Sequence, residues 1–323
     1  MSLLPDPPDP VLESAAQELA DATAGHPRIY EVPPEEGRKI LADLQAGDGV
    51  DKPLVEEQWV NVDAGDRGTV RTRIVRPVDA SGDPPVLIYI HGAGWVFGDE
   101  DTHDRLVREL AVGAGVAVVF PVYKRAPEAR YPVQIEQNYA VAQWVAKQGR
   151  EYGLDTSRLA VCGDSVGGNM ATVLALMAAE RGDVDLRAQV LLYPVTDANF
   201  ETASYLQFAD GYYLTRDGMK WFWDQYIPDP EQRGDVYASP LQASEERLAA
   251  LPTTLVITDE ADVLRDEGEA YAARLRAAGV DVTAVRVEGM VHDFLMLDSL
   301  RDCRATVVAR TLAVDAVRRA LHG

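Results

Sequence analysis

The sequence predicts an α/β protein with a mostly parallel, doubly wound central sheet. Short runs rich in β-branched residues alternate with helical patterns through the middle and end of the chain, as parallel strands alternate with their crossover helices. The runs Val86–Ile90 and Val116–Phe120 are continuously apolar, as expected of strands that helices cover on both faces. At 323 residues, the chain can bury a large core in one large domain or two smaller ones.

The elements of this alternation follow in order along the chain. Strands are expected at the short β-branched runs, which are Thr69–Val75, Val86–Ile90, Val116–Val122, Leu159–Cys162, Gln189–Tyr193, Thr254–Thr258 and Val282–Val287. Helices are expected at the longer amphipathic or apolar segments between and after them, which are His103–Gly113, Pro132–Gly149, Gly168–Arg181, Asp266–Gly279 and Arg301–Leu321.

Two segments interrupt the alternation. Residues 1–52 begin with a proline-rich stretch and then carry two helical patterns, Val11–Ala24 and Glu35–Gln45. Residues 200–236 hold nine of the 24 aromatic side chains, with a helix expected from Thr215 as N-cap to a stop before Pro228. We expect both segments to form a cap over the carboxyl edge of the sheet, where open α/β sheets bind ligands. The core domain then comprises residues 53–199 and 237–323.

The charge of the chain limits its partners. Lys and Arg number 31 against 52 Asp and Glu, which gives a net charge of −21. An acidic surface repels phosphate backbones, so nucleic acid is not an expected partner. Solubility alone explains the charge, and a preference for neutral or cationic substrates stays open as an alternative.

Targeting and cofactor signals are absent from the sequence. The first basic residue is Arg28, so no positively charged secretory signal is recognisable. No apolar run approaches the ~18 residues that a membrane span requires, and we expect a cytoplasmic protein. The two cysteines, Cys162 and Cys303, are too few for a disulfide framework or a zinc site. We expect them to be buried, with a bridge between them left open, and we expect no cofactor and no metal.

A nucleophile elbow is the sharpest chemical signal. The sequence Gly163-Asp164-Ser165-Val166-Gly167 follows an apolar strand and precedes a helical run. A G-x-S-x-G motif in that context holds a serine on a strained strand-to-helix turn, where larger flanking residues would clash. The helix N-terminus lends partial positive charge to an anion that forms at the serine. Ser165 is therefore the expected nucleophile.

An oxyanion hole is expected after the strand Val86–Ile90, at His91-Gly92-Ala93-Gly94-Trp95. Backbone amides on a loop of small residues stabilise a tetrahedral oxyanion without reorganising. We expect the amides of Gly92, Ala93 and Val166 to be the donors. His91 is expected to be a structural hydrogen-bonding group in this loop, because in this fold the histidine base follows the nucleophile.

The general base follows by elimination among five histidines, which are His26, His91, His103, His292 and His322. Only His292 lies just past the last predicted strand, Val282–Val287, where a carboxyl-edge loop can present it. The triad acid should follow the preceding strand, Thr254–Thr258, where the candidates are Asp259, Glu260, Asp262 and Asp266. Asp266 and Glu267 are expected to begin the next helix, and Asp262 lies in the loop itself. From the residues alone, the choice of acid stays open.

These segments resemble the bacterial hormone-sensitive-lipase-like esterases, family IV of the α/β-hydrolase superfamily. The resemblance rests on His91–Trp95, Pro121–Glu128, Gly163–Asn169, Asp262–Gly268 and Val291–Phe294. It implies an α/β-hydrolase fold with helices on both faces of the sheet, a helical cap, and Asp262 as the triad acid. Ala93 and Val166 replace the family's usual glycine and alanine, and their larger side chains narrow the acyl site.

The resulting interpretation is a serine carboxylester hydrolase. Ser165 attacks the ester carbonyl, His292 transfers the proton, and Asp262 orients His292. The resemblance implies small esters with short- to medium-chain acyl groups. The same residues could cleave an amide, a formamide or a lactone, and a non-catalytic receptor on this fold is the remote alternative. The sequence leaves the oligomeric state open, a homodimer included.

Aromatic residues are expected to line the substrate pocket. Trp221 and Trp223 point about 200° apart on a helix, so both cannot face the sheet. One aromatic face of this cap helix should therefore lie above Ser165. The residues expected to bind substrate are Trp95, Phe97, Phe208, Tyr212 and Val291.

Overall fold

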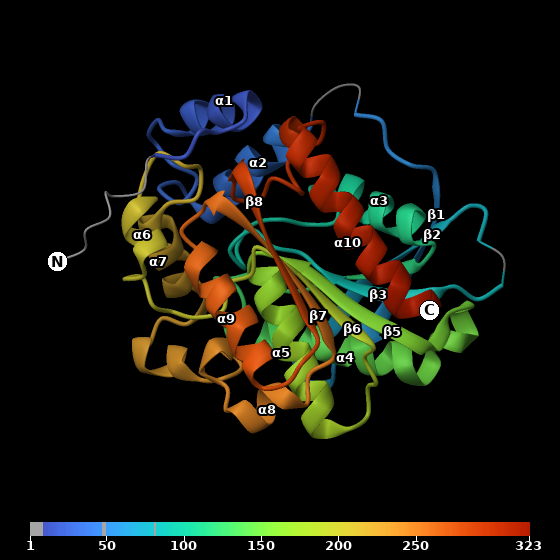
Figure 1. The fold of residues 1–323 in the computed structure, drawn as a ribbon. Helices are drawn as coiled ribbons and strands as arrows, with labels where there is room; N and C mark the ends of the chain where they lie inside the picture. Colours follow the sequence, from blue (N-terminus) through green and yellow to red (C-terminus); the bar gives the residue numbers. More distant parts are fainter. Residues whose placement is uncertain (1–8, 47–49, 81) are drawn as a thin grey trace.

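The computed structural model describes residues 9–46, 50–80 and 82–323 (Figure 1). The start of the predicted cap segment, residues 1–8, and residues 47–49 lie outside this range. A single eight-stranded sheet runs through the molecule in the order β1-β2-β4-β3-β5-β6-β7-β8. Its strands are β1 (Val55–Asp63), β2 (Thr69–Pro77), β3 (Pro85–Ile90), β4 (Ala117–Val122), β5 (Asp155–Asp164), β6 (Ala188–Leu192), β7 (Thr253–Ala261) and β8 (Val282–Val291).

Most of the sheet is parallel, as predicted. The pairs formed by β3 with β4 and β5, and those that continue through β6 and β7 to β8, are parallel. The two antiparallel pairs are β1 with β2 and β2 with β4. The sequence analysis missed β1, because this edge strand carries mostly exposed polar residues and lacks the alternation of a half-buried strand.

Helices cover both faces of the sheet (Figure 1). Helices α3 (Asp104–Ala114) and α10 (Arg304–His322) pack together on one face, and α4 (Val133–Gln148), α5 (Val166–Arg181) and α9 (Arg265–Ala277) cover the other. The short α8 (Glu245–Ala249) packs against α9. The residues of β3 are fully buried, which confirms the prediction of a strand covered on both faces.

The two interrupting segments are helical. The first contains α1 (Ser14–Thr23) and α2 (Pro34–Leu44), and the second contains α6 (Ala203–Gln207) and α7 (Arg216–Tyr226). The predicted cap of α7 is confirmed, because the Thr215 hydroxyl accepts a hydrogen bond from the Gly218 amide at 3.0 Å. Among the described helices, none combines the length and the apolar character needed to cross a bilayer.

Two smaller expectations need revision. Helix α9 begins at Arg265, and Leu264 is its N-cap, so Asp266 lies inside the first turn. The Glu267 carboxylate is buried and accepts hydrogen bonds from the Thr196 and Asp197 amides, at 2.6 and 3.2 Å. It therefore ties α9 to the chain that follows β6. Both thiols are free, and Cys162 is buried as expected, whereas Cys303 is only partly buried.

Candidate active site

Ser165 lies on a sharp turn between β5 and α5. Its φ of 54° and ψ of −123° are strained for a residue with a side chain. The neighbouring glycines make the turn sterically feasible. A Cβ at Gly163 would lie 2.3 Å from the Gly167 carbonyl oxygen, and a Cβ at Gly167 would lie 2.1 Å from that of Ile90. The G-x-S-x-G pattern therefore reflects close backbone contacts on both sides of the serine.

The three side chains of the predicted triad lie in hydrogen-bonding contact. The His292 Nε2 is 2.9 Å from the Ser165 Oγ, and the His292 Nδ1 is 2.8 Å from the Asp262 Oδ2. The Asp262 Oδ1 accepts a hydrogen bond from the Leu264 amide at 3.0 Å. Asp262 directly follows β7 and His292 directly follows β8, so the parallel register brings the acid and the base to the same edge of the sheet.

The charges around His292 shift its titration upward. Burial alone would lower the pKa of His292, because it disfavours the imidazolium. The attraction of the Asp262 and Asp293 carboxylates, together with the hydrogen bond to Asp262, outweighs burial and raises the pKa of His292 above its usual value. A protonated His292 ring is therefore stabilised in this site.

The other candidate acids are placed differently. Asp259 is fully buried, and burial together with the neighbouring Asp262 raises its pKa well above the usual value. A like charge beside a buried carboxyl disfavours its ionised form, so the neutral acid form of Asp259 is favoured. The Glu260 Oε2 accepts a hydrogen bond from the Gly289 amide at 2.8 Å.

One group of side chains in the described residues has metal-ligand geometry. Asp259, Asp262 and His292 present ligand atoms within 4.8 Å of one another. The His292 Nδ1, however, already hydrogen bonds to Asp262, and the pKa of Asp259 favours its neutral acid form, which is a poor ligand. The donor set fits a proton relay better than a metal site.

The loop His91–Trp95, in which an oxyanion hole was expected and which is called the oxyanion loop below, requires a correction at Gly92. The Gly92 amide donates to the Asp164 carboxylate, at 3.1 and 3.2 Å from its two oxygens, so it is not free for an oxyanion. Asp164 directly precedes Ser165 and is fully buried, so its carboxylate anchors this loop. The amides of Ala93, Gly94 and Val166 hydrogen bond to no other described residue.

His91 and His103 are both fully buried near Asp164. The His91 ring stacks on Tyr123, with centroids 4.2 Å apart. Burial, aided by His103, lowers the pKa of His91 to about 3, so its ring is neutral and structural. The His103 Nε2 lies 3.2 Å from an Asp164 oxygen, and the Tyr89 hydroxyl donates to the other at 2.6 Å. These groups hold Asp164, and through it the Gly92 amide.

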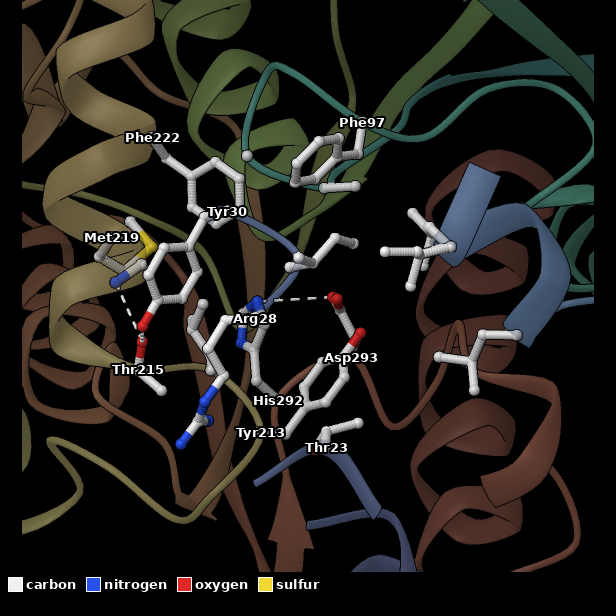
Figure 2. A pocket seen from close by; sticks show the side chains of 18 of the residues that line it. Thr23, Arg28, Tyr30, Phe97, Tyr213, Thr215, Met219, Phe222, His292 and Asp293 are labelled. Carbon is white, nitrogen blue, oxygen red and sulfur yellow. Dashed lines mark hydrogen bonds and ion pairs between the residues drawn. The ribbon is translucent and has the colours of Figure 1, made fainter. Parts of the chain in front are cut away.

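A cavity of about 360 Å³ is lined by Ser165 and His292, and Figure 2 shows His292 at its wall. Both interrupting segments contribute to its wall, together with the oxyanion loop. The N-terminal segment supplies residues from Ala22 to Leu44, and the aromatic segment supplies residues from Tyr213 to Phe222. Residues of both interrupting segments thus meet at one cavity.

Of the five residues expected to bind substrate, Phe97 lines the cavity, whereas Trp95, Phe208, Tyr212 and Val291 are not among its lining residues. Trp95 is fully buried and stacks on Tyr226, with centroids 4.2 Å apart. The ring of Phe208 is buried beneath the Arg265 guanidinium, which lies 5.0 Å from its centroid. Aromatic character alone did not separate wall residues from core residues.

The face of α7 that lines the cavity is that of Met219 and Phe222, one turn apart. Trp223 is fully buried, and Trp221 stacks on Phe97 with centroids 5.8 Å apart. The sequence analysis also missed Arg28, Tyr30 and Asp293 among the lining residues. For Asp293 a signal existed, because it directly follows the predicted base. For the N-terminal residues the sequence held none, since their approach depends on tertiary packing.

Comparison with known proteins shows that this chain is similar to esterases. Residues 87–296 match the family described as having the alpha/beta hydrolase fold. Carboxylesterase NlhH of Mycobacterium tuberculosis is 35% identical over 97% of this chain and 93% of its own length. Ethyl acetate hydrolase of Pseudomonas putida is 39% identical over 73% of this chain and 74% of its own. The crystal structure of a thermostable esterase from Pseudomonas putida superposes with a TM-score of 0.93 at 47% identity, over 98% of this chain and 99% of the other.

Proposed function

This chain belongs to the hormone-sensitive-lipase-like family IV of the α/β hydrolases and is a carboxylester hydrolase, and from that premise we propose that it cleaves short- to medium-chain esters through Ser165, His292 and Asp262. The observation that carries the proposal is the unbroken relay from the Ser165 Oγ through the His292 ring to Asp262, at 2.9 and 2.8 Å. Ser165 and His292 line a cavity large enough for a small ester.

In the proposed reaction, the Ser165 Oγ attacks the ester carbonyl carbon while the His292 Nε2 takes its proton. The tetrahedral intermediate collapses when the protonated His292 gives that proton to the leaving alkoxide, which departs as the alcohol. Water then attacks the acyl-enzyme by the same route, and the carboxylic acid leaves. Asp262 holds the Nδ1–H tautomer and stabilises the imidazolium in both steps.

We assign the oxyanion hole to the amides of Ala93, Gly94 and Val166. Gly94 replaces Gly92 in this assignment, because the Gly92 amide is committed to Asp164. The Val166 amide lies at the N-terminus of α5, whose partial positive charge adds to the stabilisation of the oxyanion. The two interrupting segments form the cap in this proposal, and they enclose the part of the ester remote from the carbonyl.

The pH profile should follow from the raised pKa of His292. His292 must be neutral to accept the Ser165 proton, so kcat/KM falls as the pH drops through the pKa of His292. Since the Asp262 and Asp293 carboxylates raise that pKa, we expect the acidic limb above pH 6.5, the usual value for histidine. A profile of kcat/KM from pH 5 to 10 measures it. A limb at or below pH 6.5 would contradict the assigned charge environment.

Acyl-chain preference should depend on Phe222. Its ring packs against Gly94, where a Cβ would lie 2.1 Å from the ring, so it limits the space beside the oxyanion loop. We expect kcat/KM to peak at acyl chains of about two to eight carbons, with the peak moving to longer chains in Phe222→Ala. Each newly accommodated methylene should contribute about 0.8 kcal/mol, or roughly fourfold in kcat/KM.

A p-nitrophenyl ester series tests this prediction, and aryl amides and lactones run beside it test the preference for esters. Leu206→Ala is the matched control, because Leu206 lies in the same segment but is 56% exposed and outside the cavity wall. The same chain-length peak in Phe222→Ala, Leu206→Ala and the unmodified protein would show that core loops, and not the cap, set the chain-length preference.

A further inference from the structure

Asp293 holds an unusual position beside the general base. Its φ of 64° lies in the left-handed region, which glycine adopts at less cost than a residue with a side chain. The amides of Met296 and Leu297 both donate to its backbone carbonyl at 2.9 Å, which fixes the turn. The side chain is only 8% exposed. Strained backbone of this kind concentrates at functional sites, and here it places a carboxylate inside the cavity.

The Asp293 carboxylate faces the cavity and the catalytic histidine (Figure 2). Its Oδ1 lies 3.4 Å from the His292 Nε2, too far for a strong hydrogen bond, and it has no hydrogen-bond partner among the described residues. The same Nε2 is already 2.9 Å from the Ser165 Oγ. Asp293 therefore keeps unused hydrogen-bonding capacity toward the cavity.

Two other chargeable groups line the cavity outside the triad, and both have partners. The Arg28 guanidinium is 2.7 Å from the Asp210 carboxylate, and the His26 ring is 2.7 Å from the Glu31 carboxylate. The Arg28 guanidinium is thus paired through Nη2, although its buried Nε has no partner among the described residues. A charged group on a bound ester therefore faces Asp293, a lining residue whose carboxylate makes no hydrogen bond to another described residue.

We propose that Asp293 is a specificity-determining residue, which makes this esterase favour esters that carry an ammonium group over matched esters that carry a carboxylate. The inference rests on the proposed function, because it concerns esters bound above Ser165. An ammonium group on the ester carries a positive charge that complements the Asp293 carboxylate, whereas a substrate carboxylate would be held near a like charge in a partly desolvated cavity. The sequence left a preference for cationic substrates open, and this proposal assigns that preference to Asp293.

The charge of Asp293 depends on its surroundings. The pKa of Asp293 is raised to about 6. Burial and the charges of Asp164 and Asp262 raise this pKa, whereas His292 and His103 lower it. Above that pH Asp293 is an anion, so the discrimination between cationic and anionic esters should increase as the pH rises through 6. The same carboxylate helps to raise the pKa of His292, so its removal should also move the acidic limb of kcat/KM to lower pH.

The test compares Asp293→Asn and Asp293→Gly with the unmodified enzyme on two matched sets of esters. The first set varies the acyl side with p-nitrophenyl butyrate, mono-p-nitrophenyl succinate and p-nitrophenyl 4-(trimethylammonio)butyrate. The second varies the alcohol side with acetylcholine and its neutral isostere 3,3-dimethylbutyl acetate. Asn keeps the size of the side chain, and Gly suits the backbone angle, so a folding defect would not affect both variants alike.

We expect the preference for the cationic ester to fall roughly 10- to 100-fold in both variants, in at least one set, as for the loss of one charge-assisted contact. Asp302→Asn is the matched control, because it removes one negative charge at a site where the side chain is 83% exposed. An unchanged preference in both sets, or an equal change in Asp302→Asn, would overturn the proposal. Hydrolysis of the neutral esters reports on the proposed function separately, because it does not depend on the charge ratio.

Discussion

Ser165→Ala is expected to lower kcat by about 10⁶-fold, and His292→Ala by nearly as much, because the members of a triad act as one unit. The 2.9 Å contact between the Ser165 Oγ and the His292 Nε2 is the physical basis. Without the base, the serine hydroxyl keeps its proton and attacks poorly. Without the serine, the base has no nucleophile to activate. Initial rates on p-nitrophenyl butyrate with each variant measure the two losses.

The double variant distinguishes a shared mechanism from two independent ones. If Ser165 and His292 act in the same step, removing both should cost little more than removing either alone. Losses that multiply in the double variant would show that the two residues do not share one proton transfer. Circular dichroism of each variant serves as the control for folding.

Asp262→Asn is expected to lower kcat roughly 10⁴-fold while the protein stays folded. Both carboxylate oxygens of Asp262 accept hydrogen bonds, one from the Leu264 amide and one from the His292 Nδ1–H. An asparagine offers only one accepting oxygen, and its NH₂ group would hold the histidine in the tautomer whose Nε2 carries the proton. That tautomer cannot accept the proton of Ser165.

The same exchange at Glu260 is the matched control for Asp262→Asn. Glu260 was an alternative acid in the sequence, but its Oε2 accepts from the Gly289 amide and it has no hydrogen bond to His292 among the described residues. We expect Glu260→Gln to retain kcat within a few-fold. Near-normal kcat in Asp262→Asn, or a large loss in Glu260→Gln, would move the role of the acid away from Asp262.

The local chemistry of the site could be predicted from the sequence because it depends on short-range rules. The glycines around Ser165 are required by backbone contacts, and the order of nucleophile, acid and base follows the order of the parallel strands. His292 was expected in a loop past the strand Val282–Val287, and β8 continues to Val291, directly before it. The structure holds Ser165, His292 and Asp262 in one hydrogen-bonded series.

The missed features depend on contacts between distant segments. The Gly92 amide is unavailable because Asp164, 72 residues later, turns its carboxylate toward it. Trp95 and Phe97 are two residues apart, yet one packs on Tyr226 in the core and the other lines the cavity. In an irregular loop, the spacing of residues does not indicate which side chain packs in the core and which lines a cavity. Strand β1 was missed because an exposed edge strand has no buried face to pattern.

The most direct test of the central claim is to map the residue that a p-nitrophenyl alkylphosphonate modifies covalently. This probe transfers its phosphoryl group to an activated serine and releases p-nitrophenol, which mimics the acylation step. The account predicts one label per chain, located by peptide mass spectrometry on Ser165, with labelling strongly slowed in His292→Ala. A label on another residue, or labelling of Ser165 at the same rate without His292, would contradict it.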